Sequence, residues 1–248
     1  MASSAVQTLE ALLQGKKLGS TLGRLREQPR QIPTGVPALD REIGGGWRLG
    51  TMSELVGRRG SGRTSVVLRT LAAATRVGQV VALVDTLDRF DPAQAEVAGV
   101  DLEAVLWVRG APVMAETARP PVVEQAVKQA IRACDLILRA GGFTVVVLDL
   151  ADVAPRRVQA VPAISWLRLA HNTEGRDTVC LLTGESPMGR SANGVSVLTE
   201  ARPIWTGTSA QSRRLAGLTP TFRVRAGLEV ARRHEPVAAR LTAGWARG

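Results

Sequence analysis

A short apolar segment, Met52–Val56, runs directly into a glycine-rich stretch, Gly57-Arg58-Arg59-Gly60-Ser61-Gly62-Arg63-Thr64, and then into a helical pattern that ends at Thr75. The spacing is that of the G-x-x-x-x-G-K-[ST] phosphate loop, whose glycines let backbone N–H groups surround a phosphate at a helix N-terminus. In that motif lysine reaches the phosphates and the hydroxyl binds Mg²⁺. Here Arg63 occupies the lysine position. The order strand, loop, helix predicts a nucleotide site in an α/β fold.

A second element of such a site lies farther along the chain. The segment Val145–Leu150 is a continuous apolar strand pattern with Asp149 near its end, where a carboxylate can bind Mg²⁺ directly or through water. The residues predicted to bind a nucleotide are Gly57, Gly60, Gly62, Arg63, Thr64, Ser65 and Asp149. The expected ligand is ATP or ADP, and Thr64 and Asp149 would hold Mg²⁺ only when that nucleotide is bound. The alternative is an empty site whose glycine turn is kept because the fold needs it.

Short apolar runs alternate with longer helical patterns through the middle of the chain. The predicted strands are Met52–Val56, Val80–Val84, Val105–Val108, Val145–Leu150 and Val179–Thr183. The predicted helices are Thr64–Thr75, Pro92–Ala98, Val122–Leu138 and Val158–His171. Strands this uniformly apolar are typical of a parallel sheet that is covered on both faces. The sequence therefore predicts an α/β fold with a mostly parallel central sheet flanked by helices.

Beyond this core the pattern changes. Two polar stretches, 184–201 and 206–217, are predicted to be loops. From Phe222 to Leu241 apolar and polar residues alternate, which is typical of half-exposed strands. We expect basic, antiparallel strands that close the sheet at one edge.

The N-terminal segment is predicted to be separate from the main body. Apolar residues at helical spacing give a short helix one apolar face, which must bind either its own core or another molecule; they are Val6, Leu9, Leu12 and Leu13. A polar linker from Gly15 to Pro33 follows. The predicted division is residues 1–31 for the helix and linker and 32–248 for the core, in which 201–248 form a basic C-terminal segment.

Composition excludes several classes of protein. Apolar residues make up 45% and charged residues 22% of the chain, as in globular proteins, and no run approaches the roughly 18 apolar residues of a membrane span. The first residues lack the basic and apolar regions of a signal peptide, so we expect a cytoplasmic protein without a membrane partner. Cys134 and Cys180 lie in apolar segments, and both histidines stand apart from other metal-ligating residues. This pattern predicts neither a disulfide nor a protein-only metal site.

The net charge of +10 is concentrated at the C-terminus, where residues 201–248 hold nine arginines and two glutamates. Such a segment predicts contact with phosphate backbones or with an acidic protein. The residues predicted to bind DNA, without sequence preference, are Arg202, Arg213, Arg214, Arg223, Arg225, Arg232 and Arg233. The alternatives are a solvated surface and, for the arginine pairs, a contact between subunits. Trp205 and Trp245 lie in this segment and could stack on bases or anchor an interface.

Five groups of residues carry a family resemblance. They are Ile32-Pro33-Thr34-Gly35 with Leu39-Asp40; Ile43-Gly44-Gly45-Gly46; Glu54 to Thr64; Asp85 and Asp91-Pro92 with Gly99-Val100-Asp101; and Val145–Asp149. In this order and spacing, residues 32–183 resemble the core of the bacterial recombinase RecA and its relatives. The resemblance implies a RecA-like fold, ATP at the phosphate loop and DNA as a partner. It also implies self-association, in which the N-terminal element of one subunit docks on the core of the next.

Four positions depart from the family's pattern. Leu87 stands where the relatives have the glutamate that activates the attacking water, and Gln94 stands where they have a tyrosine that stacks on adenine. Gly184, followed by Glu185, replaces the glutamine that senses the γ-phosphate. Arg63 keeps the charge of the usual lysine but is bulkier and forked. Because leucine cannot accept a proton, the resemblance implies a degenerate site with little or no ATP hydrolysis.

A RecA relative with a degraded nucleotide site and a basic C-terminal segment resembles the ImuA-type accessory proteins of DNA-damage-induced mutagenesis. The resemblance implies a non-catalytic role in the translesion-synthesis mutasome of the SOS response, with RecA, an inactive ImuB-type Y-family polymerase and DNA as partners. Inhibition of RecA recombination is expected. One alternative is an active DNA-dependent ATPase or recombinase in which Arg63 and Asp88 have taken over the lost roles. Another is a SulA-like cell-division inhibitor, against which the loop Gly57–Thr64 argues.

Overall fold

The structure, a computed structural model, describes residues 30–110, 112, 120–209, 211–225, 237–238 and 241–242. The chain divides into two compact units, Met1–Arg30 and Gln31–Gly248, and the described residues after Arg30 all belong to the second unit. The residues singled out in the sequence that lie outside the described part are Val6, Leu9, Leu12, Leu13, Arg232, Arg233 and Trp245.

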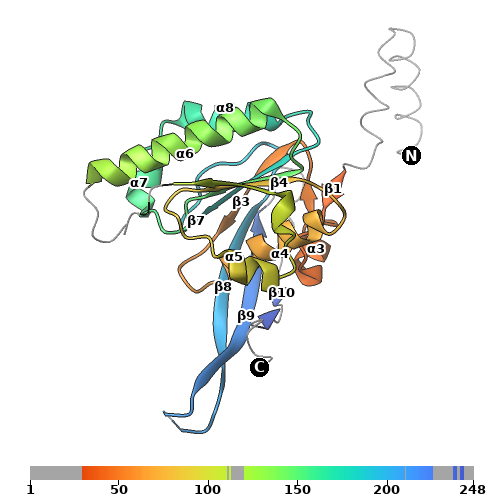
Figure 1. The fold of residues 1–248 in the computed structure, drawn as a ribbon, viewed down its shortest axis with the longest axis vertical. Helices are drawn as coiled ribbons and strands as arrows, with labels where there is room; N and C mark the ends of the chain where they lie inside the picture. Colours follow the sequence, from red (N-terminus) through yellow and green to blue (C-terminus); the bar gives the residue numbers. More distant parts are fainter. Residues whose placement is uncertain are drawn as a thin grey trace, which may run out of the picture. The chain divides into compact units, whose positions relative to one another are not determined.

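Parallel strands form the centre of the second unit (Figure 1). The strands are β3 (Thr51–Val56), β4 (Val81–Asp85), β5 (Val105–Arg109), β6 (Val145–Asp149), β7 (Val179–Gly184), β8 (Ser196–Thr206), β9 (Arg214–Arg225), β10 (Val237–Ala238) and β11 (Leu241–Thr242). Among the described residues they form a nine-stranded sheet of order β10-β9-β8-β3-β7-β6-β4-β5, in which β11 also pairs with β9. Neighbours from β8 to β5 in this order are parallel, whereas β9 is antiparallel to β8, β10 and β11. The predicted sheet, mostly parallel with an antiparallel edge, is confirmed.

Helices cover both faces of the sheet. Successive side chains of a strand point to opposite faces, so one strand contributes to the apolar clusters on both sides. In β4, Val81 and Leu83 belong to one apolar cluster, and Ala82 and Val84 belong to the other. The first cluster includes residues of α3 (Pro37–Glu42), α4 (Arg63–Thr75) and α5 (Pro92–Val97), and the second includes residues of α6 (Pro120–Ala140), α7 (Pro155–Gln159) and α8 (Ala163–Thr173). The remaining elements are η1 (Leu102–Ala104) and a small sheet of β1 (Gln31–Ile32) and β2 (Trp47–Arg48). Within the described residues, no helix combines the length and apolarity that a bilayer crossing needs.

The single helix predicted over Val158–His171 is wrong, because the structure has two helices there, α7 and α8. Pro162 stands at the N-cap of α8 with φ −58° and ψ 136°, outside the helical region. Proline lacks the N–H that would continue an upstream helix, and its ring clashes with the preceding turn. The chain therefore ends one helix before Pro162 and starts another after it.

The two segments predicted to be loops, 184–201 and 206–217, are loops only in part. Residues 185–195 and the described residues of 207–213 lie outside the strands, whereas 196–201 and 214–217 belong to a long hairpin. Its pairing runs from Ser196 opposite Arg225 to Thr206 opposite Arg214. Only the first residues of β8 are consistently buried, and most of its second half is exposed. The hairpin extends away from the helices (Figure 1). An exposed strand has no need of alternating apolar residues, and so the sequence does not mark it.

Candidate nucleotide site and basic hairpin

The glycine loop lies between the C-terminal end of β3 and the N-terminus of α4. Gly60 and Gly62 have φ of 78° and 90°, in the left-handed region that glycine adopts without a Cβ clash. Gly57 is required for another reason, because a Cβ there would clash with the carbonyl oxygen of Thr199 on β8. The backbone thus has the turn and the helix terminus that suit an anion.

Arg63 is the first residue of α4 and is only 5% exposed. Its Nη1 is buried and has no hydrogen-bond partner among the described residues. Burial lowers the pKa of Arg63, and nearby carboxylates, first Asp149 and then Glu185, oppose that effect. A buried cation with an unused donor beside the glycine loop fits an anionic ligand. Thr64 is exposed and Ser65 is half-buried, so both hydroxyl-bearing residues can be reached from solvent.

Asp149 ends β6 and pairs with Asp85 of β4 in the register of the sheet. Its Oδ1 accepts hydrogen bonds from Oγ1 of Thr183, at 2.5 Å, and from the N–H of Ala151, at 2.9 Å. Burial raises the pKa of Asp149, and these two hydrogen bonds only partly oppose the effect. An oxygen ligand at this edge of the sheet suits Mg²⁺, although Thr183 already uses one of the carboxylate oxygens.

The segment after β4 offers no carboxylate that could activate water at the loop, among the residues that the structure describes. Leu87 is 3% exposed and packs in the core. Both oxygens of Asp88 accept hydrogen bonds from Arg109, from Nε at 2.9 Å and from Nη2 at 2.8 Å. Arg109 ends β5, the fourth strand from β3 in the sheet, so its Cα lies on the order of 19 Å from the strand that leads into the loop. The ion pair occupies both oxygens of Asp88, and it lowers the pKa of Asp88, which weakens it as a base.

Asp85 fixes the turn that carries Asp88. Its Oδ1 accepts the N–H of Arg89 and its Oδ2 accepts the N–H of Phe90, both at 2.8 Å. Nε1 of Trp107 also donates to Oδ2, at 3.3 Å, and the Phe90 ring packs edge-on against Trp107 with centroids 5.2 Å apart. Asp88 itself has φ 58°, a left-handed conformation that this network holds in place. The turn has a structural function that depends on Arg109 and Trp107, which the sequence analysis did not single out.

The end of β7 lacks a side chain that could sense a phosphate. Gly184 is the last residue of β7, and the exposed Glu185 that follows carries a negative charge. The chain then returns to β3, where Oε2 of the buried Glu54 accepts the N–H groups of Met188 and Gly189 at 2.8 and 3.1 Å. These two hydrogen bonds fix Met188 and Gly189 against β3.

These residues fit a phosphate group but not a complete ATP-hydrolysing site. The glycine turn and Arg63 suit the phosphate, whereas Leu87 and Gly184 provide neither a base nor a sensor. Gln94 is exposed on α5 and brings no aromatic ring for a base. A cavity of about 430 Å³ extends the positive surroundings of the loop; it is lined by Arg59, Arg89, Val123, Asp152, Val153, Ala154, Pro155, Arg156, Arg157 and Glu185.

The hairpin β8–β9 carries the described arginines that are candidates for DNA binding. Its register pairs Ser196 with Arg225, Leu198 with Arg223 and Arg202 with Thr219. Paired residues, and residues two apart along a strand, point to the same face. Arg202, Arg223 and Arg225 therefore share one face of the hairpin, which we call the arginine face. It spans seven residues of β8, Ser196 to Arg202, which is roughly 20 Å.

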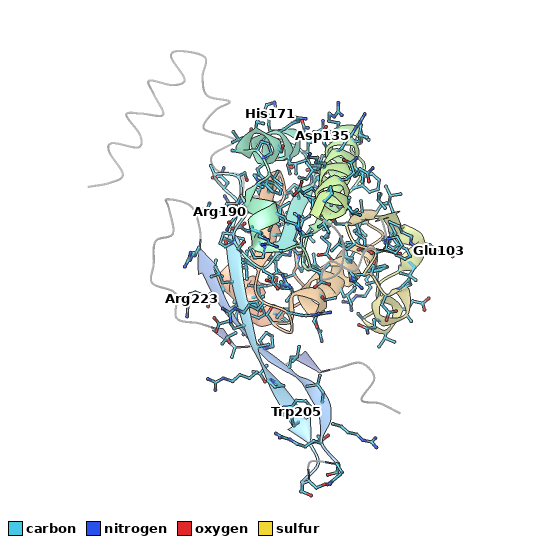
Figure 2. The ribbon with its side chains drawn as sticks, turned by 90° about the vertical axis from the view of Figure 1, so that its left-hand side faces the viewer. Glu103, Asp135, His171, Arg190, Trp205 and Arg223 are labelled. Atoms are coloured by element: carbon cyan, nitrogen blue, oxygen red, sulfur yellow. The ribbon has the colours of Figure 1, made fainter. Side chains whose placement is uncertain are left out.

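The outer end of the hairpin combines an aromatic ring with cations (Figure 2). Trp205 is 48% exposed, and the guanidinium of Arg213 lies 5.4 Å from the centre of its ring. Arg214 pairs with Thr206 in the last described pair of the hairpin. Figure 2 shows Arg223 much nearer the core than Trp205. An exposed ring beside guanidinium groups is typical of surfaces on which single-stranded nucleic acid stacks.

The inner part of the hairpin contacts the glycine loop. Oγ1 of Thr199 on β8 donates to the carbonyl of Ser61 at 2.8 Å. A Cβ placed on Gly62 would lie 3.5 Å from Cβ of Pro220 on β9. The loop and the hairpin therefore form one packed unit. No local sequence signal points to Thr199 or Pro220, because only the pairing of distant strands brings them to the loop.

Comparison with known proteins agrees with this fold. The model of the RecA N-terminal domain matches residues 4–159, more than half of the chain. Among similar proteins named Protein RecA are those of Symbiobacterium thermophilum, 34% identical over 142 residues, Nocardia farcinica, 36% over 139, and Methylococcus capsulatus, 37% over 127. These alignments cover 56%, 54% and 50% of this chain, and 36%, 36% and 33% of the relatives. The chain thus spans about a third of the length of the curated relatives that it matches.

Proposed function

The chain belongs to the RecA family, and we propose that it is a non-catalytic member that acts by binding its partners. The observation that carries this proposal is the segment after β4, where Leu87 is packed in the core and Asp88 is held by Arg109. A general base must lie within about 3 Å of the attacking water. Leu87 has no basic atom, and both oxygens of Asp88 are occupied by Arg109. The same geometry argues against the alternative of an active ATPase that uses Asp88.

In this proposal ATP or ADP is a bound ligand that is not turned over. Backbone N–H groups of the loop and the guanidinium of Arg63 hold phosphate oxygens, and Thr64 and Asp149 hold Mg²⁺, which neutralises phosphate charge. The buried, unpartnered Nη1 of Arg63 supports this assignment. Because Thr199 joins the loop to β8, nucleotide binding stabilises the base of the hairpin.

The hairpin is the proposed DNA-binding element, with contacts that do not depend on sequence. The arginine face contacts backbone phosphates, and Trp205 stacks on bases beside Arg213. In this proposal Arg214, Arg232 and Arg233 provide further contacts to DNA phosphates.

Regulation of RecA is the biological role that we propose. The face formed by Val6, Leu9, Leu12 and Leu13 would dock on a RecA subunit, in the cytoplasm, as the N-terminal element does in RecA assemblies. A subunit that joins a filament without turning over ATP blocks its active state. Such inhibition suits an accessory factor of DNA-damage-induced mutagenesis that works with an ImuB-type polymerase-like partner in translesion synthesis.

A strand-exchange assay with the cognate RecA tests this role. We expect exchange to fall as this protein approaches equimolar amounts. The double substitution Leu9→Gln and Leu12→Gln should relieve the inhibition, since each buried leucine contributes about 1.5–3 kcal/mol. The same changes at Leu18 and Leu22, in the polar linker, are the matched control and should leave inhibition intact. Normal exchange at stoichiometric excess, together with no detectable complex with RecA, would contradict the proposal.

A further inference from the structure

A groove between the two helices on the α6 face is separate from the glycine loop and from the hairpin. Helices α6 and α8 lie side by side on the sheet in both views (Figures 1 and 2). Together with Arg157 of α7 and the turn before α8 they enclose an open cavity of about 460 Å³. Its apolar lining includes Val127, Ile131, Val161 and Leu169; Val127 and Leu169 are almost fully buried, so the apolar surface open to a partner comes from the half-buried Ile131 and Val161. The floor of this groove is therefore hydrophobic.

The rim of the groove carries surplus positive charge. Its two acids are already paired: Asp135 lies 2.9 Å from Arg139, and Glu124 lies 3.2 Å from Arg157. The cations that remain are Lys128, Arg132 and Arg168, all exposed, and the structure gives them no ion pair within its described residues. Lys128 and Arg132 are one helical turn apart on α6, and Arg168 comes from α8.

We propose that this groove binds an amphipathic helix of a partner protein whose apolar residues are flanked by Asp and Glu. The apolar floor accepts the hydrophobic face of the helix, and Lys128, Arg132 and Arg168 attract the acids beside it. The occupant is helical because an apolar floor between two helices offers no sheet edge, so the backbone of the ligand must satisfy its own hydrogen bonds. The chain's own first 29 residues carry four Lys or Arg and two Glu. Their net positive charge is repelled by this rim, which favours a segment of another protein as the occupant.

Nucleic acid fits this groove less well, although it is also anionic. Phosphate groups gain nothing from Ile131 and Val161, and burying them against an apolar floor costs hydration. The proposed ligand is therefore a protein, and this inference rests neither on ATP binding nor on the hairpin.

Fluorescence anisotropy of the full chain with a labelled 18-residue peptide tests the proposal. The probe contains leucines on one helical face and glutamates on the other, and its control is the same composition scrambled. The amphipathic probe should bind, and Lys128→Gln with Arg132→Gln and Arg168→Gln should weaken it about tenfold. Ile131→Gln, which changes the half-buried floor without removing charge, should also weaken it.

Loss of charge elsewhere is the matched control. Arg202→Gln with Arg223→Gln and Arg225→Gln also removes three positive charges, and it should leave peptide binding within about twofold because these residues lie outside the groove. No binding of the probe, equal binding of the scrambled peptide, or equal affinity for both triple variants would overturn the proposal. A groove variant that loses DNA binding but keeps the peptide would also overturn it and identify the groove as a nucleic-acid surface.

Discussion

Replacing Arg202, Arg223 and Arg225 with glutamine removes the arginine face of the hairpin while leaving its backbone pairing in place. Each arginine that neutralises a DNA phosphate releases counterions, which contributes about 0.9 to the slope of log K against log salt for duplex DNA. If all three contact phosphates, the triple variant has a slope shallower by about 2.7. Between about 50 and 200 mM salt this difference corresponds to roughly a 40-fold change in the ratio of the two affinities. The wild-type advantage should therefore shrink steeply as salt rises.

Anisotropy titrations of a labelled duplex of mixed sequence, at four or more salt concentrations, measure both slopes. The control is the triple variant Lys128→Gln, Arg132→Gln and Arg168→Gln, which has the same net charge but an intact hairpin. Its slope should stay close to that of the wild type. Equal slopes for the wild type and the hairpin variant would refute the assignment of phosphate contacts to the arginine face. Equal losses in both variants would show that net charge, and not this face, drives binding.

Three further predictions concern single residues. Trp205→Ala should weaken binding of single-stranded DNA roughly 5- to 150-fold, with Trp205→Phe weakening it less, because stacking contributes about 1–3 kcal/mol per base; unchanged affinity in both variants would exclude stacking. Burial raises the pKa of Asp149, so this carboxyl costs folding stability as the pH rises above its ordinary pKa, and the cost is complete above the raised pKa; Asp149→Asn should raise the urea midpoint at neutral pH and lose this advantage in acid, and a lower midpoint at neutral pH would contradict the reasoning. Arg109 holds the pKa of Asp88 below its ordinary value, so the stability from this carboxylate is present above that ordinary value and is lost as the pH falls through the lowered pKa; Asp88→Asn should lower the urea midpoint at pH 7 with a deficit that closes in acid, and a deficit independent of pH would indicate that the ion pair is not its source.

The central part of the fold could be predicted from the sequence because its signals are local. An uninterrupted apolar run marks β6, and the glycines of the loop mark the end of β3 and the start of α4. The hairpin β8–β9 could not be predicted in the same way. Its strands are stabilised by pairing between residues as far apart as Ser196 and Arg225, and its outer half is exposed, so no periodic burial appears in the sequence.

In the candidate site, too, some features can be predicted from local sequence and others depend on tertiary contacts. The loss of a carboxylate at Leu87 can be read from the sequence, because the neighbouring motif sets the register. The position of Asp88 cannot, since its partner Arg109 is brought to it by the pairing of β4 with β5, in which Asp85 lies opposite Arg109. The burial of Arg63 and the contact of Thr199 with the loop also depend on tertiary packing.

The rate of ATP hydrolysis by the purified chain, with and without single-stranded DNA, tests the central claim most directly. Release of phosphate should be slower than that of an ordinary RecA under the same conditions by a factor of at least about 10², because neither Leu87 nor the Arg109-bound Asp88, in the described segment after β4, can serve as the base. Single-stranded DNA should not raise the rate, and Leu87→Glu alone should not restore it, since Gly184 and Gln94 remain. DNA-stimulated turnover by the unmodified chain at a rate close to that of RecA would contradict the claim that this family member acts by binding alone.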